Sequence, residues 1–202
     1  MDVLVIDYSM GNLRSVSNAL RAVGAAPVVS NDPADLAQAA RIVLPGVGAF
    51  GDGMRNLRER GWVEPLEREV LQRGKPFLGL CVGMQLLAER GTEHGSHTGL
   101  GWIEGTVERL PSDEVRVPHI GWNDVTVRDG ARLYEGVEQP VFYFVHSYAL
   151  VPNDDRVVTG SCTYGIEFAA SVEQGNVHAT QYHPEKSQQA GLGVIRNFLQ
   201  RC

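Results

Sequence analysis

Short apolar runs alternate with amphipathic stretches in the first half of the chain. The runs at 3–7, 27–30, 42–44 and 77–80 have the length and composition of buried strands, whereas 13–23 repeats its apolar residues at helical spacing. Strands that alternate with helices are typical of a parallel sheet with helices on both faces. We therefore predict an α/β fold with a mostly parallel central sheet.

The second half of the chain has a different pattern. After Gly99 several β-rich segments follow one another, at 106–110, 124–127, 141–145, 157–162 and 166–172. We expect them to complete the sheet as an antiparallel extension. A final helix at 191–201 carries Leu192, Ile195 and Leu199 at helical spacing, which predicts packing against the core.

Two polar stretches are interpreted as surface features. The amphipathic, basic stretch 55–73 is most simply a solvated helical face. The segment 92–98 is expected to be a loop, in which His94 and His97 lack the further ligands that a metal site needs. No metal and no other cofactor is predicted.

Composition fits a single domain over 1–202. The chain is 43% apolar and 21% charged, and its net charge of −6 argues against nucleic acid as a partner. No apolar run approaches the ~20 residues that span a bilayer, and the first residues indicate a strand rather than a signal peptide. Three cysteines suit a reducing compartment, with Cys162 and Cys202 as structural thiols. We therefore expect a cytoplasmic protein without membrane association.

The segment 76–87 contains the strongest candidate for chemistry. An apolar strand runs into Cys81, which is flanked by Gly79 and Gly83, and continues directly as a helix. This pattern is typical of a nucleophile elbow, in which small neighbours leave room for a sharp turn. A helix N-terminus favours negative charge and therefore the reactive thiolate. The alternative is that Cys81 is a buried structural thiol.

A second candidate follows the strand-like segment 176–180. His183 and Glu185 stand two residues apart, and Pro184 biases His183 away from helical geometry. In an extended segment such side chains point to the same side, so the carboxylate can orient the imidazole. Together with Cys81 they form a consistent Cys-His-Glu triad. Taken alone, His183 could instead be a surface histidine.

A glycine-rich turn ends the strand-like run that begins at Arg41. Gly46, Val47 and Gly48 can aim backbone N–H groups at a developing oxyanion. The turn could also bind phosphate or simply redirect the chain. A dinucleotide site is not expected, because the acidic ribose-binding residue of that fingerprint is missing downstream.

These motifs, in this order, resemble the class I glutamine amidotransferases. Four further segments resemble the glutaminase subunits of imidazole glycerol phosphate synthases: Asp-Tyr-Ser-Met-Gly-Asn-Leu at 7–13, Val-Pro-His-Ile-Gly-Trp-Asn at 117–123, Tyr-Phe-Val-His-Ser-Tyr at 143–148 and His-Pro-Glu-Lys-Ser at 183–187. The resemblance covers essentially the whole chain. It departs slightly at Ser9, where the family often has glycine, and at Tyr182, where phenylalanine is common. It implies a three-layer, flavodoxin-like α/β fold.

The resemblance implies that glutamine is hydrolysed to glutamate and ammonia. Cys81 would attack the side-chain amide, and His183 would protonate the leaving nitrogen. Backbone N–H groups of Val82 and of the 46–48 turn would hold the oxyanion, and a turn that flips would make the activity switchable. The residues expected to bind glutamine are Gln85, Gly48, Ser147 and Tyr148. Gln85 could instead be a polar helix residue, and His146 a structural histidine.

Because the glutaminase motifs use the whole chain, another polypeptide must consume the ammonia. The resemblance implies a heterodimer with a (β/α)8-barrel cyclase that makes imidazole glycerol phosphate and aminoimidazole carboxamide ribotide in histidine biosynthesis. The residues expected at this interface are Trp122, Asn123, Tyr143 and Lys186. The alternative for the two aromatic residues is core packing.

Two other functions fit parts of the pattern. One is a related enzyme, either a glutaminase that serves another synthase or a hydrolase with a cysteine elbow. Such hydrolases normally carry the acid and the histidine on separate loops, which disfavours that reading. The other is a non-enzymatic binding subunit, which would have little reason to retain Cys81, His183 and Glu185 together.

Overall fold

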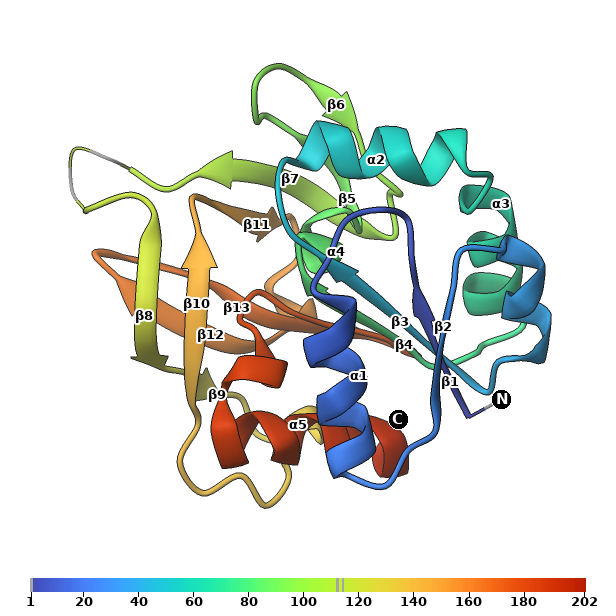
Figure 1. The fold of residues 1–202 in the computed structure, drawn as a ribbon. Helices are drawn as coiled ribbons and strands as arrows, with labels where there is room; N and C mark the ends of the chain where they lie inside the picture. The colour runs from blue at the N-terminus through green and yellow to red at the C-terminus, as the bar shows by residue number, and fades with distance from the viewer. Residues whose placement is uncertain (1, 112, 114) are drawn as a thin grey trace.

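One eight-stranded sheet forms the centre of the protein in the computed structural model, which describes residues 2–111, 113 and 115–202 (Figure 1). The strand order is β2-β1-β3-β4-β14-β13-β12-β9. The parallel part consists of β1 (Val3–Ile6), β2 (Pro27–Ser30), β3 (Arg41–Gly46), β4 (Phe77–Cys81) and β14 (Val177–Thr180). The antiparallel part consists of β13 (Ile166–Gln174), β12 (Val158–Tyr164) and β9 (Thr126–Val127).

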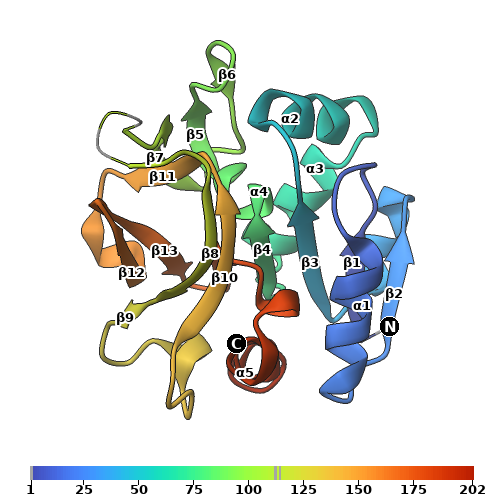
Figure 2. The ribbon, with the colours of Figure 1, turned by 60° about the vertical axis from the view of Figure 1, so that its left-hand side comes forward.

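Helices cover both faces of the parallel part (Figures 1 and 2). On one face α1 (Leu13–Ala22) and α5 (Gln188–Arg201) pack on alternate strand residues such as Val3. On the other face α2 (Phe50–Glu59) and α3 (Val63–Leu66) pack on the intervening residues such as Leu4. Successive strand side chains point to opposite faces, so the apolar runs fill two cores at once. The predicted three-layer α/β architecture is confirmed.

The second half of the chain is organised differently from the prediction. Among the described residues of this half, β9, β12 and β13 are the antiparallel strands that extend the central sheet. The strand β10 (Val141–His146) pairs with β8 (His119–Asp124) in a separate two-stranded sheet. A third sheet joins β11 (Tyr148–Pro152), β7 (Ile103–Arg109), β5 (Ala88–Gly91) and β6 (His97–Thr98). The expected loop at 92–98 is therefore the tip of a hairpin whose last two residues are in β6.

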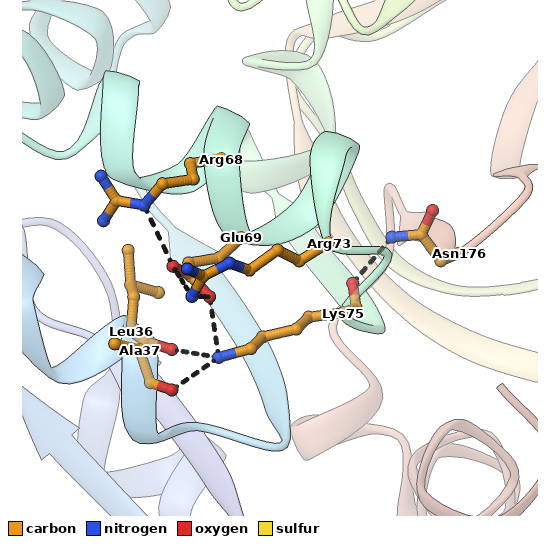
Figure 3. Close-up of polar contacts among 7 residues, drawn as sticks. All are labelled: Leu36, Ala37, Arg68, Glu69, Arg73, Lys75 and Asn176. Carbon is orange, nitrogen blue, oxygen red and sulfur yellow. Dashed lines mark hydrogen bonds and ion pairs between the residues drawn. The ribbon is translucent and has the colours of Figure 1, made fainter.

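The interpretation of 55–73 as a solvated helical face is wrong for part of that stretch. It is divided into the end of α2, the short α3 and a π-helical segment Glu67–Gln72. Within that segment Glu69 is fully buried. Its carboxylate is held by the side chains of Arg68, Arg73 and Lys75, at 3.1, 2.9 and 2.9 Å (Figure 3).

Lys75 connects this ion-pair cluster to the neighbouring elements. Its Nζ also donates to the carbonyl oxygens of Leu36 and Ala37, and its own carbonyl accepts a hydrogen bond from the Asn176 side chain (Figure 3). One buried carboxylate thus organises the connection that leads into β4. The sequence did not reveal that role, because no local signal distinguishes Glu69 from the exposed Glu59 and Glu64 of the same stretch.

Candidate active site

The residues predicted to carry chemistry meet where parallel strands end. Gly46 at the end of β3 is in register with Cys81 at the end of β4, and β14 lies on the other side of β4. His183 follows β14 by three residues, since that strand ends at Thr180. The carboxyl ends of parallel strands lie at one edge of a sheet, which is where open α/β folds place their sites.

Cys81 occupies a strained turn between β4 and the one-turn helix α4 (Val82–Gln85). Its backbone has φ 54° and ψ −108°, a region that residues with a Cβ atom rarely adopt. The turn was predicted correctly, but the helix is much shorter than its apolar sequence suggests, because the chain enters β5 at Ala88. Cys81 itself is 3% exposed.

Glycines make this turn sterically feasible. A Cβ atom on Gly83 would lie 2.0 Å from the Leu44 carbonyl oxygen, and one on Gly79 would lie 2.6 Å from the Gly83 carbonyl oxygen. A Cβ atom on Gly46 would lie 2.7 Å from the Gly83 nitrogen. Backbone thus packs directly on backbone beneath Cys81, and any side chain at these positions would move the turn.

His183 and Glu185 form a buried pair. The Nδ1 atom of His183 lies 2.8 Å from Oε1 of Glu185, and the two side chains are 4% and 2% exposed. The pairing was expected from an extended segment, but Glu185 lies in a 3-10 turn, Pro184–Lys186. His183 precedes that turn with extended backbone geometry, so the turn itself brings the carboxylate back to the ring.

The pKa of His183 is raised to about 10. Burial lowers it, but hydrogen bonding to the side chains of Cys81 and Glu185 raises it by more, and electrostatic interaction with both groups adds to this. The opposite ring nitrogen, Nε2, is buried and has no nitrogen or oxygen partner among the described residues. His183 is therefore poised as an imidazolium with one N–H available for proton transfer.

Backbone contacts fix the position of His183. Its N–H donates to the Tyr143 carbonyl at 2.9 Å, and its carbonyl accepts a hydrogen bond from the Ser187 hydroxyl at 2.6 Å. The same Ser187 oxygen accepts the Tyr143 N–H at 3.0 Å. These three bonds tie the turn that carries His183 to β10. Ser187 was not singled out from the sequence.

Cys81 and His183 both line a cavity of about 540 Å³. Its lining includes Val47, Gly48, Ala49, Cys81, Val82, Gln85, Glu93, Pro118, Val145, His146, Ser147, Tyr148 and His183. It thus brings together the predicted nucleophile, the base, two residues of the glycine-rich turn and the residues predicted to bind glutamine. Glu185 lies behind His183, outside the lining.

Gln85 is already engaged by the protein on one side. Its Nε2 atom donates to the Tyr148 carbonyl at 2.8 Å and to Oε1 of Gln181 at 3.0 Å. Gln181, which is fully buried, in turn donates to Sγ of Cys81 at 3.7 Å. Sequence reasoning missed Gln181, because only the folded chain brings it next to the sulfur.

Glu93 is a second residue that the sequence did not reveal. It lies in the segment 92–98, lines the cavity, and accepts the Phe50 N–H at the start of α2 at 2.9 Å. That contact places a carboxylate beside the residues that follow the glycine-rich turn. No local sequence signal marks it, because the segment looks like an ordinary polar loop.

His146, whose role the sequence left open, ends β10 and is buried at the cavity wall. Burial lowers its pKa to about 3; the hydrogen bond to the Tyr148 carbonyl opposes this shift, and neighbouring His119 and His183 reinforce it. His146 is therefore a neutral imidazole within the structure.

The residues predicted for the partner interface lie outside the cavity. Trp122 is 48% exposed, so core packing is excluded for it. Its ring centroid lies 6.0 Å from that of Tyr143, and Nζ of Lys186 lies 5.8 Å from the Tyr143 ring centroid. Asn123 is partly buried beside them on β8. Trp122, Tyr143 and Lys186 form one side of the β8–β10 sheet and the adjoining turn, whereas the Asn123 side chain points to the other side, toward His119.

Other sequence expectations concern cysteines, metal ions and membranes. Cys162 is buried and Cys202 half-buried, and burial raises the pKa of each thiol, to about 12 and about 11 respectively. Within the described parts of the chain, no cluster of three or more His, Cys, Asp or Glu side chains could hold a metal ion, and no helix combines the length and apolarity needed to cross a membrane.

Comparison with known proteins agrees with this geometry. The family described as glutamine amidotransferase class-I matches residues 4–202. The imidazole glycerol phosphate synthase subunit HisH of Aquifex aeolicus is 51% identical, covering 100% of this chain and 98% of that protein. The HisH subunit of Geobacter sulfurreducens is 48% identical over 97% of each chain.

A solved structure supports the fold independently. The structure of PurLQS from Thermotoga maritima superimposes with a TM-score of 0.74 at 21% identity, covering 98% of this chain and 97% of that chain. The chain therefore belongs to the class I glutamine amidotransferase family and, within it, to the HisH subunits of imidazole glycerol phosphate synthase.

Proposed function

We propose that this chain hydrolyses glutamine with Cys81, His183 and Glu185 and delivers the ammonia to a cyclase partner. The observation that carries the proposal is the convergence of Cys81 and the buried His183–Glu185 pair on one cavity. A strained nucleophile beside an oriented imidazole is the arrangement that covalent amide hydrolysis needs.

In the first half of the reaction, the Cys81 thiolate attacks the side-chain carbonyl carbon of glutamine. The oxyanion accepts hydrogen bonds from the N–H of Val82 and from one N–H of the Gly46–Val47–Gly48 turn. Gly48 has φ 99°, so the peptide before it can reorient at little cost. The C–N bond then breaks, ammonia leaves with the Nε2 proton of His183, and a glutamyl thioester remains.

In the second half, formation of the thioester removes the thiolate charge. That charge is one of the influences that raise the pKa of His183, so the imidazole can now act as a base. His183 takes a proton from water as the water attacks the thioester. Glutamate leaves, and the thiolate–imidazolium pair is restored with Glu185 holding the ring throughout.

Glutamine recognition follows from the cavity lining. Gln85, Gly48 and the backbone of Ser147 and Tyr148 surround the space beyond Cys81. Glu93 adds a carboxylate that suits an α-ammonium group. A free amino acid is thereby distinguished from a peptide-linked glutamine, which has no such charge.

The partner is proposed to dock on the outer face of β8 and β10. Ile120 and Trp122 are 59% and 48% exposed on that face, and Lys186 supplies a cation beside them. An exposed aromatic and aliphatic pair with a charged rim is typical of an interface core. The relatives are named as subunits of imidazole glycerol phosphate synthase, so a (β/α)8-barrel cyclase is the proposed occupant.

The test measures glutamate release by the chain alone, with the cyclase, and with the cyclase plus its nucleotide ligand. A weak basal rate and strong activation by the complete mixture are expected. Cys81→Ala should abolish release in every mixture while the circular dichroism spectrum stays unchanged. Glutamine turnover that does not change when the cyclase is added would mean that the partner is a different protein. Parental activity in Cys81→Ala would refute the triad.

A further inference from the structure

A continuous chain of polar side chains runs from the β8–β10 face to the cavity. Asn123 Nδ2 lies 3.4 Å from Nε2 of His119, and Nδ1 of His119 lies 3.0 Å from Nε2 of His146. Nδ1 of His146 lies 2.9 Å from the Tyr148 carbonyl oxygen. That oxygen also accepts the Gln85 amide at 2.8 Å. This series of hydrogen bonds thus ends on the Tyr148 carbonyl, which orients Gln85.

The chemistry of the two ends fixes the proton on each ring. The Tyr148 carbonyl can only accept, so Nδ1 of His146 carries hydrogen and donates. In a neutral ring Nε2 of His146 must then accept, which requires Nδ1 of His119 to carry hydrogen. Nε2 of His119 is left as the acceptor for the amide of Asn123. Every contact has one donor and one acceptor, and all bonds point toward the cavity.

The two rings cannot easily move or take up a second proton. His119 and His146 are 3% and 6% exposed. His119 stacks on Tyr164 and Phe144, with ring centroids 4.1 and 4.9 Å apart. Burial lowers the pKa of both histidines, which agrees with two neutral rings. A second proton on either ring would place two donors face to face.

Asn123 closes the chain at its outer end. Its Nδ2 atom also donates to the Thr163 carbonyl at 3.2 Å, so both amide hydrogens are used. It is next to Trp122 on β8, where the proposed partner docks. A shift of β8 would move Asn123 and His119 together, because both residues lie on this strand, and would change the contact between His119 and His146 of β10.

We propose that His119 and His146 are positioning residues that hold the Tyr148 carbonyl, and with it Gln85, in the arrangement that binds glutamine, and that Asn123 couples this arrangement to the docking face. The proposal rests on the glutaminase function proposed above and names residues that set its substrate affinity. Neither histidine transfers a proton to the substrate. Their role is to orient one carbonyl group.

Nitrogen NMR of the chain tests the proton arrangement without any assay of activity. The 15N shifts of His119 and His146 should report the Nδ1–H tautomer for both rings near neutral pH. In Asn123→Leu the shift of Nε2 of His119 should move, because it loses its donor. An Nε2–H tautomer or an imidazolium at His146 would overturn the proposal, whatever reaction the protein catalyses.

Kinetics of the chain alone tests the consequence for glutamine. His146→Phe keeps a ring but removes both bonds, and should raise KM for glutamine about tenfold while kcat changes less than about twofold. His146→Asn keeps a donor near the position of Nδ1 and should recover most of that affinity. A fall in kcat at constant KM, or equal defects in the two variants, would show that the ring only fills space.

Two further variants separate coupling from packing. Asn123→Leu should also raise KM for glutamine. Combining it with His146→Phe should raise KM little further, because both substitutions interrupt the same series of hydrogen bonds. Additive effects would overturn the coupling. Tyr164→Phe is the matched control: it keeps the ring stacked on His119, loses only a bond to the Arg116 carbonyl, and should leave KM unchanged. If the parent chain does not turn over glutamine, the proposed function fails while the NMR result stands.

Discussion

Glu185 accepts a hydrogen bond from the imidazole of His183 across a single 3-10 turn, with both side chains withdrawn from water. The second carboxylate oxygen, Oε2, is buried and has no hydrogen-bond partner among the described residues. Among the described residues, the His183 ring is therefore the hydrogen-bond partner of the Glu185 carboxylate. This relationship determines how the active site should respond to pH.

Glu185→Gln keeps the shape of this contact and removes its charge. The pKa of His183 should fall below its parental value of about 10, and glutamate release should fall by about 10- to 100-fold. NMR titration of the imidazole alongside steady-state kinetics measures both. An unchanged pKa would mean that Cys81 alone keeps His183 protonated.

The same pKa predicts a direction for stability. A histidine whose pKa is raised in the folded state stabilises that state fully below its ordinary pKa of ~6.5. This contribution should be lost as pH rises through about 10. Thermal unfolding of the parent from pH 6 to about 10 should show the loss, and Glu185→Gln should show a smaller one. Parallel curves for the two proteins would contradict this assignment.

Glu69 should respond to acid rather than to alkali. Burial raises the pKa of this carboxyl, but hydrogen bonds from Lys75, Arg68 and Arg73 lower it by more, so the folded value is below the ordinary one. Its contribution should be present above ~4.3 and lost as pH falls through the folded pKa.

Replacing Glu69 with Gln should cost about 3 kcal/mol of unfolding free energy, because it leaves the partly buried Lys75 without its counter-charge. Denaturant unfolding measures this. Glu64→Gln, at an exposed position of the nearby α3, is the matched control and should change stability by less than about 0.5 kcal/mol. Equal losses in the two variants would argue against the cluster.

Gly83→Ala tests the close packing beneath the nucleophile. The new methyl group would lie 2.0 Å from a backbone oxygen of β3, so the elbow must shift. We expect a stability loss of more than about 2 kcal/mol and loss of glutamate release. Gly53→Ala in α2 meets only the flexible Leu86 side chain, at 3.1 Å, and should be nearly neutral in both measurements. An active Gly83→Ala protein would mean that the turn is not fixed as described.

Trp122→Glu tests the docking face. Trp122 is nearly half exposed, so the chain should fold and keep its basal glutaminase rate, whereas affinity for the cyclase should fall about 100-fold. Titration calorimetry with the cyclase measures this. Val29→Glu, at a position that is 41% exposed but lies on the edge strand β2 at the far end of the central sheet, should bind as the parent does. Equal losses would show that charge, and not this face, controls binding.

Local patterns account for the part of the fold that was predicted correctly. The apolar runs that became β1, β3 and β4 are continuous, because strands covered on both faces need no alternation. The edge strand β2 is partly exposed and was recognised by its short apolar run alone. The elbow was recognisable because its glycines and its cysteine are neighbours in sequence. The same holds for His183 and Glu185, although the turn that joins them was not foreseen.

Features that depend on distant residues could not be read locally. An antiparallel strand does not reveal its partner, so the separate sheets formed by β5 to β8, β10 and β11 were missed. Gln181 gains its role only when it meets Cys81, one hundred residues away in sequence. Glu69 stands in a stretch of charged residues that looks exposed, and its burial depends on ion pairs with three basic side chains.

The different surroundings of the three thiols make the chain easy to label. Cys162 and Cys202, with pKa values raised to about 12 and about 11, hold almost no thiolate near neutral pH. Cys81 faces a cavity and has an imidazolium for a neighbour. We therefore expect alkylating reagents to treat the molecule as a single-cysteine protein that reacts at Cys81. The stoichiometry of labelling would then count intact Cys81 sites directly, and glutamine should protect against it.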